Sequence, residues 1–130
     1  MTFLLDTDAV SHALRGEGRV GEHLRAHRPS EIAVSAVTAA ELTYGVARSR
    51  ARRVAQIVTD FLEAVSIMPF DGAAARTYGP LAVWLVEAGI PIGAMDTLIA
   101  AHAVALRATL VSHNTRHFSR VRGLRLVDWF

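Results

Sequence analysis

The chain opens with the run Phe3-Leu4-Leu5-Asp6, in which three apolar residues are followed directly by an acid. Short, largely apolar segments recur at residues 32–34, 66–68, 109–111 and 124–127, and longer segments separate them. Such runs are typical of strands that are buried on both faces, and parallel strands need crossover connections, which are usually helices. The pattern therefore predicts a three-layer α/β domain, in which a short-stranded parallel sheet is flanked by helices.

The segments between these runs have helical spacing. Helices are expected at residues 8–14, 18–27, 54–65, 72–87 and 94–106, with another around Glu41. Asp8 and Asp71 are expected to cap the helices at whose starts they lie. No linker, repeat or low-complexity segment divides the 130 residues. A chain of this length is enough for one domain, so we expect a single domain over residues 1–130.

Composition excludes several classes of function. Hydrophobic residues make up 52% of the chain and charged residues 20%, which excludes disorder as the main state. There is no Cys, so disulfides, thiolate metal sites and cysteine nucleophiles are excluded. All 14 cationic residues are Arg, which also excludes chemistry that needs a lysine. Neither a membrane span of roughly 20 apolar residues nor the basic region of a signal peptide is found.

Three acids lie in segments with no other charge nearby. Glu41 is the only charged residue between positions 32 and 47, Asp96 is the only one between 88 and 106, and Asp6 ends the first apolar run. A carboxylate in an apolar segment has a large desolvation penalty unless something compensates its charge. Mg²⁺ or Mn²⁺ would compensate three carboxylates together, because these ions prefer hard oxygen ligands. Ligands of parallel sheets bind at the carboxyl ends of strands, where Asp6 lies.

Each of these acids also fits a structural role. Thr38 and Glu41 have the spacing of a capping box, in which the glutamate bonds back to the start of its helix. Asp96 fits the N-terminal cap of a helix, and Asp6 fits an ordinary turn residue at the end of a strand. The coincidence of three acids in the least charged parts of the chain favours the metal-binding interpretation.

Four blocks of the sequence stand in the order and at the spacing of a known family. They read FLLDTD at 3–8, SAVTAAELTYG at 35–45, GAMDTLIAAHA at 93–103 and LVSHNTRHF at 110–118. These blocks resemble the four signature blocks of PIN-domain ribonucleases, and in particular those of the VapC toxins of bacterial VapBC toxin–antitoxin pairs. The resemblance covers essentially the whole chain.

This resemblance implies a small cytoplasmic endoribonuclease, the toxin of a type II toxin–antitoxin system, which cleaves RNA phosphodiesters with a carboxylate-bound Mg²⁺ or Mn²⁺. It implies Asp6, Glu41 and Asp96 as metal ligands, and these three with Asn114 as the catalytic residues. The family suggests tRNA as the substrate class and a VapB-like antitoxin as the partner. A homodimer is expected as well, because the 52% hydrophobic content favours apolar surface that a partner covers.

The fourth block departs from the family pattern at Asn114, where many members have an acid. The carbonyl oxygen of Asn can ligate a metal or bond its water, but it brings no charge. Two close metals would leave more positive charge than three acids offset. The sequence therefore predicts one firmly held metal and a second that binds only weakly.

Residues near the acids have predicted supporting roles. Ser35, Thr38 and Ser112 would orient the carboxylates. The segment from 97 to 127 contains five Arg residues and no acid, a formal charge of +5 that suits a polyanion. Arg116 and Arg120 of this segment would contact RNA phosphates, because a guanidinium bonds phosphate oxygens bidentately. No platform of aromatic and basic residues for base stacking is visible in the sequence.

Three other interpretations have some support. Asp6 and Asp8 match the Asp-x-Asp motif of haloacid-dehalogenase-like phosphatases, although that chemistry normally uses a Lys. His113 and His117 have the four-residue spacing of a metal-binding pair on a helix, without a matching third ligand. Asn114 is the one feature that favours a catalytically weak PIN-like module, which would only bind RNA or a protein.

Overall fold

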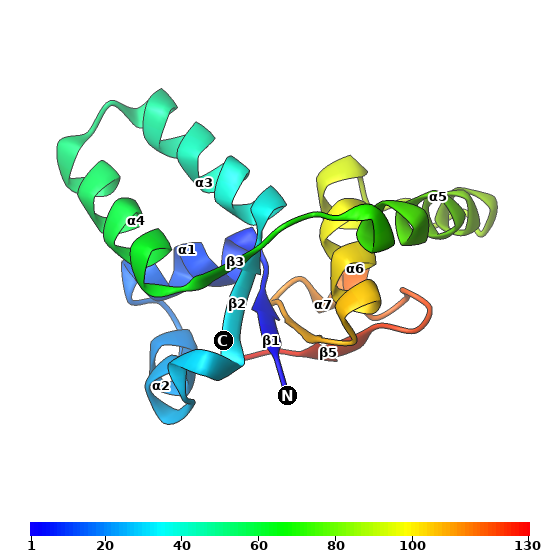
Figure 1. The fold of residues 1–130 in the computed structure, drawn as a ribbon, viewed down its shortest axis with the longest axis horizontal. Coiled ribbons are helices and arrows are strands. Elements are labelled where there is room, and N and C mark those ends of the chain that lie inside the picture. The colour runs from blue at the N-terminus through cyan, green and yellow to red at the C-terminus, as the bar shows by residue number, and fades with distance from the viewer.

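The computed structural model describes residues 1–130, and its centre is a five-stranded parallel sheet (Figure 1). The strands are β1 (Phe3–Leu5), β2 (Ile32–Ser35), β3 (Ser66–Met68), β4 (Thr109–Val111) and β5 (Arg125–Val127). Their order in the sheet is β3-β2-β1-β4-β5, and every neighbouring pair is parallel. The predicted strands and the parallel sheet are confirmed.

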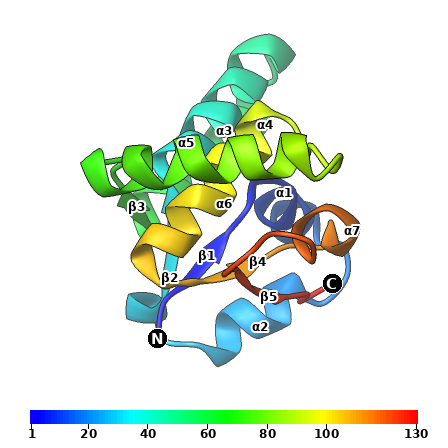
Figure 2. The same ribbon diagram turned by 90° about the vertical axis from the view of Figure 1, so that its right-hand side faces the viewer.

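Helices cover both faces of the sheet, which gives the predicted three layers. They are α1 (Thr7–Arg15), α2 (Val20–Ala26), α3 (Ala36–Ser49), α4 (Arg52–Ala64), α5 (Gly72–Glu87), α6 (Ala94–Leu106) and α7 (Thr115–Phe118), with a 3₁₀ turn at Pro29–Glu31. Figure 1 shows α1, α2 and α4 on one side of the sheet and α5, α6 and α7 on the other. Figure 2 looks onto the second side, where α5 and α6 cross in front of the strands. None of the helices is long and apolar enough to cross a membrane.

The central strands β1, β2 and β4 are almost entirely apolar because each of them contributes side chains to two cores. Successive side chains of a strand point to opposite faces of the sheet. Leu4 and Leu110 therefore pack in a core with α5 and α6, while Leu5 and Val111 pack in a second core with α1, α2 and α4. All four side chains are at most 1% exposed.

The cap of α5 agrees with the sequence prediction, and the cap of α1 does not. Asp71 caps α5, because its carboxylate accepts a hydrogen bond from the backbone N–H of Ala74 at 3.0 Å. The prediction that Asp8 caps the first helix is wrong. Asp6 is the cap of α1 and accepts a bond from the N–H of Ala9 at 2.8 Å, whereas Asp8 is exposed in the first helical turn. The helix starts two residues earlier than a cap at Asp8 would require.

The strand order reverses between β1 and β4. From β1 the chain proceeds to β2 and β3 on one side, and then returns to β4 and β5 on the other. Ligands of such sheets bind where the order reverses, outside the carboxyl ends of the strands. Leu5 and Val111 are paired in register, so Asp6 and Ser112 leave β1 and β4 at the same level on either side of this point.

Candidate active site

Four acids gather at the carboxyl edge of the sheet. Asp6 follows β1, Asp8 lies in the first turn of α1, Glu41 lies in the second turn of α3 and Asp96 lies in the first turn of α6. Asp8 and Asp96 both raise the pKa of Asp6, and Glu41 and Asp8 both raise the pKa of Asp96. The structure therefore brings together the three acids predicted from sequence and adds Asp8 to them.

Asp6 is the most buried acid of the group. Its side chain is 3% exposed, and burial raises its pKa from 3.8 to about 6. Hydrogen bonds from the Ser112 hydroxyl and the Ala9 N–H lower this pKa but do not offset burial. Nearby Asp8 and Asp96 raise it further. A carboxylate in this position is stabilised by a cation.

Asp96 is half-buried, and its pKa is raised as well. Burial is the main cause, followed by the charges of Glu41 and Asp8, while His117 at 4.0 Å acts in the opposite direction. The capping interpretation of Asp96 is wrong, because Gly93 is the N-cap of α6, with a φ of 91°, and no side chain caps this helix. Asp96 instead lies within the first turn.

Glu41 is held by a threonine from the neighbouring helix. The hydroxyl of Thr7, between Asp6 and Asp8, donates a hydrogen bond to Glu41 Oε1, and it lies 3.4 Å from the hydroxyl oxygen of Thr38. The capping-box interpretation is wrong, because α3 begins at Ala36 with a Ser35 cap and therefore has Thr38 inside the helix. Thr38 is therefore linked to Glu41 through the hydroxyl of Thr7.

Ser35 supports the site indirectly. Its hydroxyl oxygen accepts a bond from the N–H of Val37 at 3.0 Å, and it lies 2.8 Å from Nδ1 of His102. His102 on α6 is 1% exposed, and burial lowers its pKa. Ser35 thus fixes the start of α3 against α6, and no hydrogen bond joins it to an acid.

Asn114 is connected to the acids through His117. Its side-chain amide nitrogen lies 3.0 Å from His117 Nδ1, and its backbone N–H donates to the Ser112 hydroxyl at 2.9 Å. His113 has a different partner, Asp128, at 3.0 Å. The interpretation of His113 and His117 as a metal-binding pair is therefore wrong, because the two side chains serve different contacts.

The donor set fits a divalent cation. Four carboxylates share one edge of the sheet, two of them have raised pKa values, and no Arg forms a salt bridge with any of them. No three Asp, Glu or His side chains converge on one point in this arrangement. Side-chain rotation and water molecules would complete the coordination, since Mg²⁺ usually keeps several of its waters.

The predicted phosphate-binding arginines lie in and just after α7, the helix that carries His117. Arg116 precedes His117 in the short helix α7, and Arg120 follows that helix. Both are exposed, and neither forms a salt bridge. Their guanidinium groups are therefore free to meet an anionic ligand.

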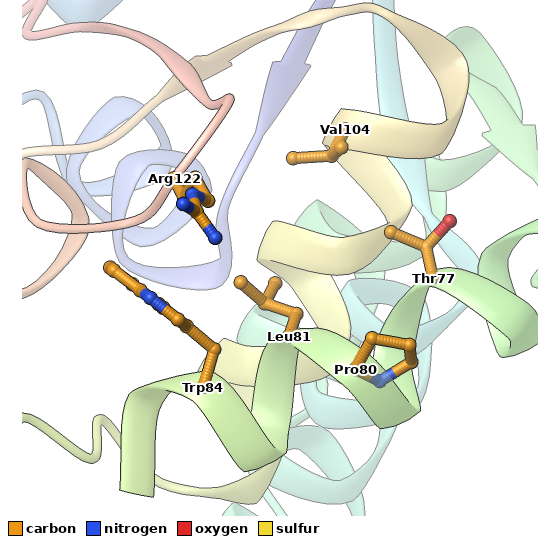
Figure 3. A pocket seen from close by; sticks show the side chains of 6 residues that line it. All are labelled: Thr77, Pro80, Leu81, Trp84, Val104 and Arg122. Carbon is orange, nitrogen blue, oxygen red and sulfur yellow. The ribbon is translucent and has the colours of Figure 1, made fainter. Parts of the chain in front are cut away.

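Another cavity, of about 260 Å³, lies between α5, α6 and the loop before β5 (Figure 3). In this cavity Arg122 lies over the ring of Trp84, 5.5 Å from the ring centre. None of the acids of the site lines it. Arg122 therefore packs on an aromatic ring, unlike Arg116 and Arg120.

From the sequence, Thr7, Asp8 and His117 were not assigned to this site, because Asp8 was interpreted as a helix cap and His117 as one of a histidine pair. Thr7 and Asp8 belong to the first block, and their position within three residues of the end of a strand was the signal that could have placed them with Asp6. His117 belongs to a helix of four residues, which is too short for a periodic pattern.

A parallel α/β sheet with acids at its reversal point defines a carboxylate-based nuclease of the PIN type, and residues 3–124 match the PIN domain. The chain belongs to the PIN-domain family and, within it, to the VapC ribonucleases. It is 32% identical to the tRNA(fMet)-specific endonuclease VapC of Shigella flexneri and 34% identical to ribonuclease VapC2 of Rickettsia felis. Each match covers 99% of this chain and 98% of the relative.

The fold leads to the same family. A crystal structure of VapBC2 from Rickettsia felis, bound to a DNA fragment from its promoter, has a TM-score of 0.92, 32% identity and full coverage of both chains. The family predicted from the four sequence blocks is confirmed, and the phosphatase interpretation is wrong. PIN-domain nucleases generally use divalent metal ions.

Proposed function

We propose that this chain is a metal-dependent endoribonuclease and the toxin of a type II toxin–antitoxin pair. The observation that carries the proposal is the buried Asp6, whose pKa is about 6 and which shares the reversal point of the sheet with three further acids. The full-length VapC relatives, which are ribonucleases by name, support the same activity. Metal-dependent RNA cleavage by the purified chain, lost on Asp96→Asn, tests it.

In this proposal Asp6, Glu41 and Asp96 hold Mg²⁺ or Mn²⁺. The ion, when bound, would lower the pKa of a water and neutralise charge that develops on the phosphoryl oxygens. Ser112 would fix the carboxylate of Asp6, and Thr38 would act on Glu41 through Thr7.

RNA is the proposed substrate and tRNA is its proposed class. The Shigella flexneri relative is named a tRNA(fMet)-specific endonuclease, and the structurally similar Rickettsia felis protein is part of a VapBC complex. We therefore propose a VapB-like antitoxin as a partner of this chain, together with a homodimer. The cytoplasm, where cellular tRNA is found, is the proposed location.

Replacing Arg116 and Arg120 by Gln is expected to weaken RNA binding and to lower its dependence on salt. Each lost contact with a single-strand phosphate should reduce the slope of log affinity against log salt by about 0.7. Fluorescence anisotropy with a labelled RNA over a range of salt concentrations measures this slope. Arg122→Gln is the matched control, since Arg122 packs on Trp84. An unchanged slope in the double variant would show that these arginines contact no phosphate.

Changing Asn114 to Asp is expected to raise metal affinity about tenfold, which corresponds to ~1.4 kcal/mol. The added carboxylate would lie beside His117, which contacts Asp96. It would supply the acid that many family members have at this position. Calorimetric titration with Mn²⁺ measures affinity and stoichiometry for both forms, and Asn114→Ala controls for loss of the amide. If Asn114→Asp changes neither quantity, Asn114 lies outside the metal site.

A further inference from the structure

A wide apolar cavity of about 650 Å³ lies between α3 and the start of α6. It is lined by Thr7, Val37, Ala40, Glu41, Tyr44, Met95 and Leu98. The side chains of Tyr44 and Met95 are 67% and 51% exposed, although both are large and hydrophobic. Large hydrophobic side chains that are this exposed beside a cavity indicate a binding surface.

The cavity is continuous with the acids of the active site. Glu41 and Thr7 line it, and the hydroxyl of Thr7 bonds to the carboxylate of Glu41. A phosphate that reacts at the acids would therefore lie next to the mouth of the cavity. No Arg or His lines the cavity, so its walls do not suit a second phosphate.

In RNA, each phosphate is attached to a ribose that carries a base. A base has two flat faces that stack on aromatic rings, and a methionine thioether packs well against such rings. Tyr44 and Met95 offer these two surfaces, and Val37, Ala40 and Leu98 complete an apolar wall. We propose that this cavity is a nucleobase pocket, which holds the base beside the scissile phosphate. The inference rests on the proposed ribonuclease function.

An apolar protein face fits the cavity less well. A second copy seated over it would cover Glu41 and would keep RNA from the acids, which is incompatible with the proposed activity. A nucleotide would occupy the cavity together with the ion and phosphate at the acids. A base that enters the pocket must be unpaired, so cleavage is expected in single-stranded RNA or in loops.

Nucleoside binding tests the pocket without any cleavage. Among the methionines, Met95 lines the cavity, while Met1 precedes β1 at the opposite edge of the sheet. In a protein with ¹³C-labelled methionine methyl groups, millimolar adenosine, guanosine, cytidine or uridine should shift the Met95 signal and leave Met1 unchanged. Ribose, which has no base, should shift neither. No Met95 shift with any of the four nucleosides would overturn the proposal.

Tyr44 variants give the second arm of this test. Tyr44→Ala should weaken nucleoside binding about 5- to 150-fold, the range that corresponds to ~1–3 kcal/mol per stacked base. Tyr44→Phe keeps the ring and should bind within about twofold of wild type. Equal nucleoside affinity of the Ala and Phe variants would contradict a stacking role for Tyr44.

Cleavage of an RNA library of randomised sequence connects the pocket to the reaction. Wild type should prefer certain bases at one position next to the cut, and Tyr44→Ala should lose this preference. Val83→Ala, an exposed apolar residue of α5 outside the cavity, is the matched control. If Tyr44→Ala keeps the preference but dissociates a dimer in sedimentation velocity, the surface is an interface between copies and the proposal is overturned. If wild type cleaves no RNA while nucleosides still shift Met95, the ribonuclease function fails and the pocket stands.

Discussion

Replacing Asp96 by Asn is expected to reduce Mg²⁺-dependent RNA cleavage at least about 10³-fold, a loss of ~4 kcal/mol of transition-state stabilisation. Asp96 lies among Glu41 and Asp8, which raise its pKa, so its carboxylate is a component of the shared negative charge that would hold the ion. The amide has nearly the same shape but no charge. Initial rates on a labelled RNA, measured over a range of Mg²⁺ concentrations, give the size of the loss.

The same change should leave the protein folded and make its metal-free form more stable. Asn removes the repulsion with Glu41 and Asp8, and the N-cap of α6 is Gly93, so no capping bond is lost. Circular dichroism and thermal unfolding without metal check this expectation. Asp60→Asn, an exposed acid on α4, is the matched control for activity and stability. An Asp96→Asn protein that cleaves like wild type would exclude a catalytic role for Asp96.

The metal-free protein is expected to lose stability as the pH rises from about 4 to about 6, by up to ~3 kcal/mol from Asp6 alone. The folded protein holds the Asp6 proton up to a pKa of about 6, whereas the unfolded chain releases it near the ordinary value of 3.8. In this interval the folded state binds more protons, so the free energy of unfolding falls as the pH increases. The full contribution is present below pH 3.8 and is absent above about pH 6.

Comparison with Asp6→Asn isolates the contribution of Asp6. Asn is also a good N-cap, so the bond to Ala9 at the start of α1 can be kept. Denaturant unfolding at a series of pH values should show a smaller decrease in the free energy of unfolding for the variant than for wild type. Above pH 6, saturating Mg²⁺ should stabilise the wild-type protein more than it stabilises the variant. Equal pH profiles for the two proteins would show that Asp6 is not the buried, uncompensated acid described above.

The strands were predictable because their signal is local. Leu4 and Leu5 enter different cores, so both must be apolar, and an unbroken apolar run is the direct result. Helix α7 gave no such signal, because four residues make about one turn and one buried side chain, Phe118, anchors it. The approach of His117 to Asp96 joins residues 21 positions apart, so no local pattern could show it.

The acids were predictable from their isolation in apolar segments, but their partners were not. Thr7 and Glu41 are 34 positions apart and meet only because α1 and α3 start at the same edge of the sheet. A stacking role for Tyr44 could not be predicted from the sequence, because this role depends on the exposure of its side chain beside a cavity and not on its neighbours in sequence. Asp8 was interpreted as a cap because a strand end and a helix start fall within three residues.

Mapping RNA ends after incubation with the purified chain, with Mg²⁺ in one sample and EDTA in the other, tests whether the four acids support a metal-dependent reaction. Cleavage should require Mg²⁺ and should leave ends without a 2′,3′-cyclic phosphate, because water and not the ribose 2′-hydroxyl is the expected nucleophile. It should also be absent from a parallel sample of Asp96→Asn protein. Cleavage that is equal in EDTA, or that leaves cyclic phosphate ends, would contradict a metal-dependent reaction at the four acids.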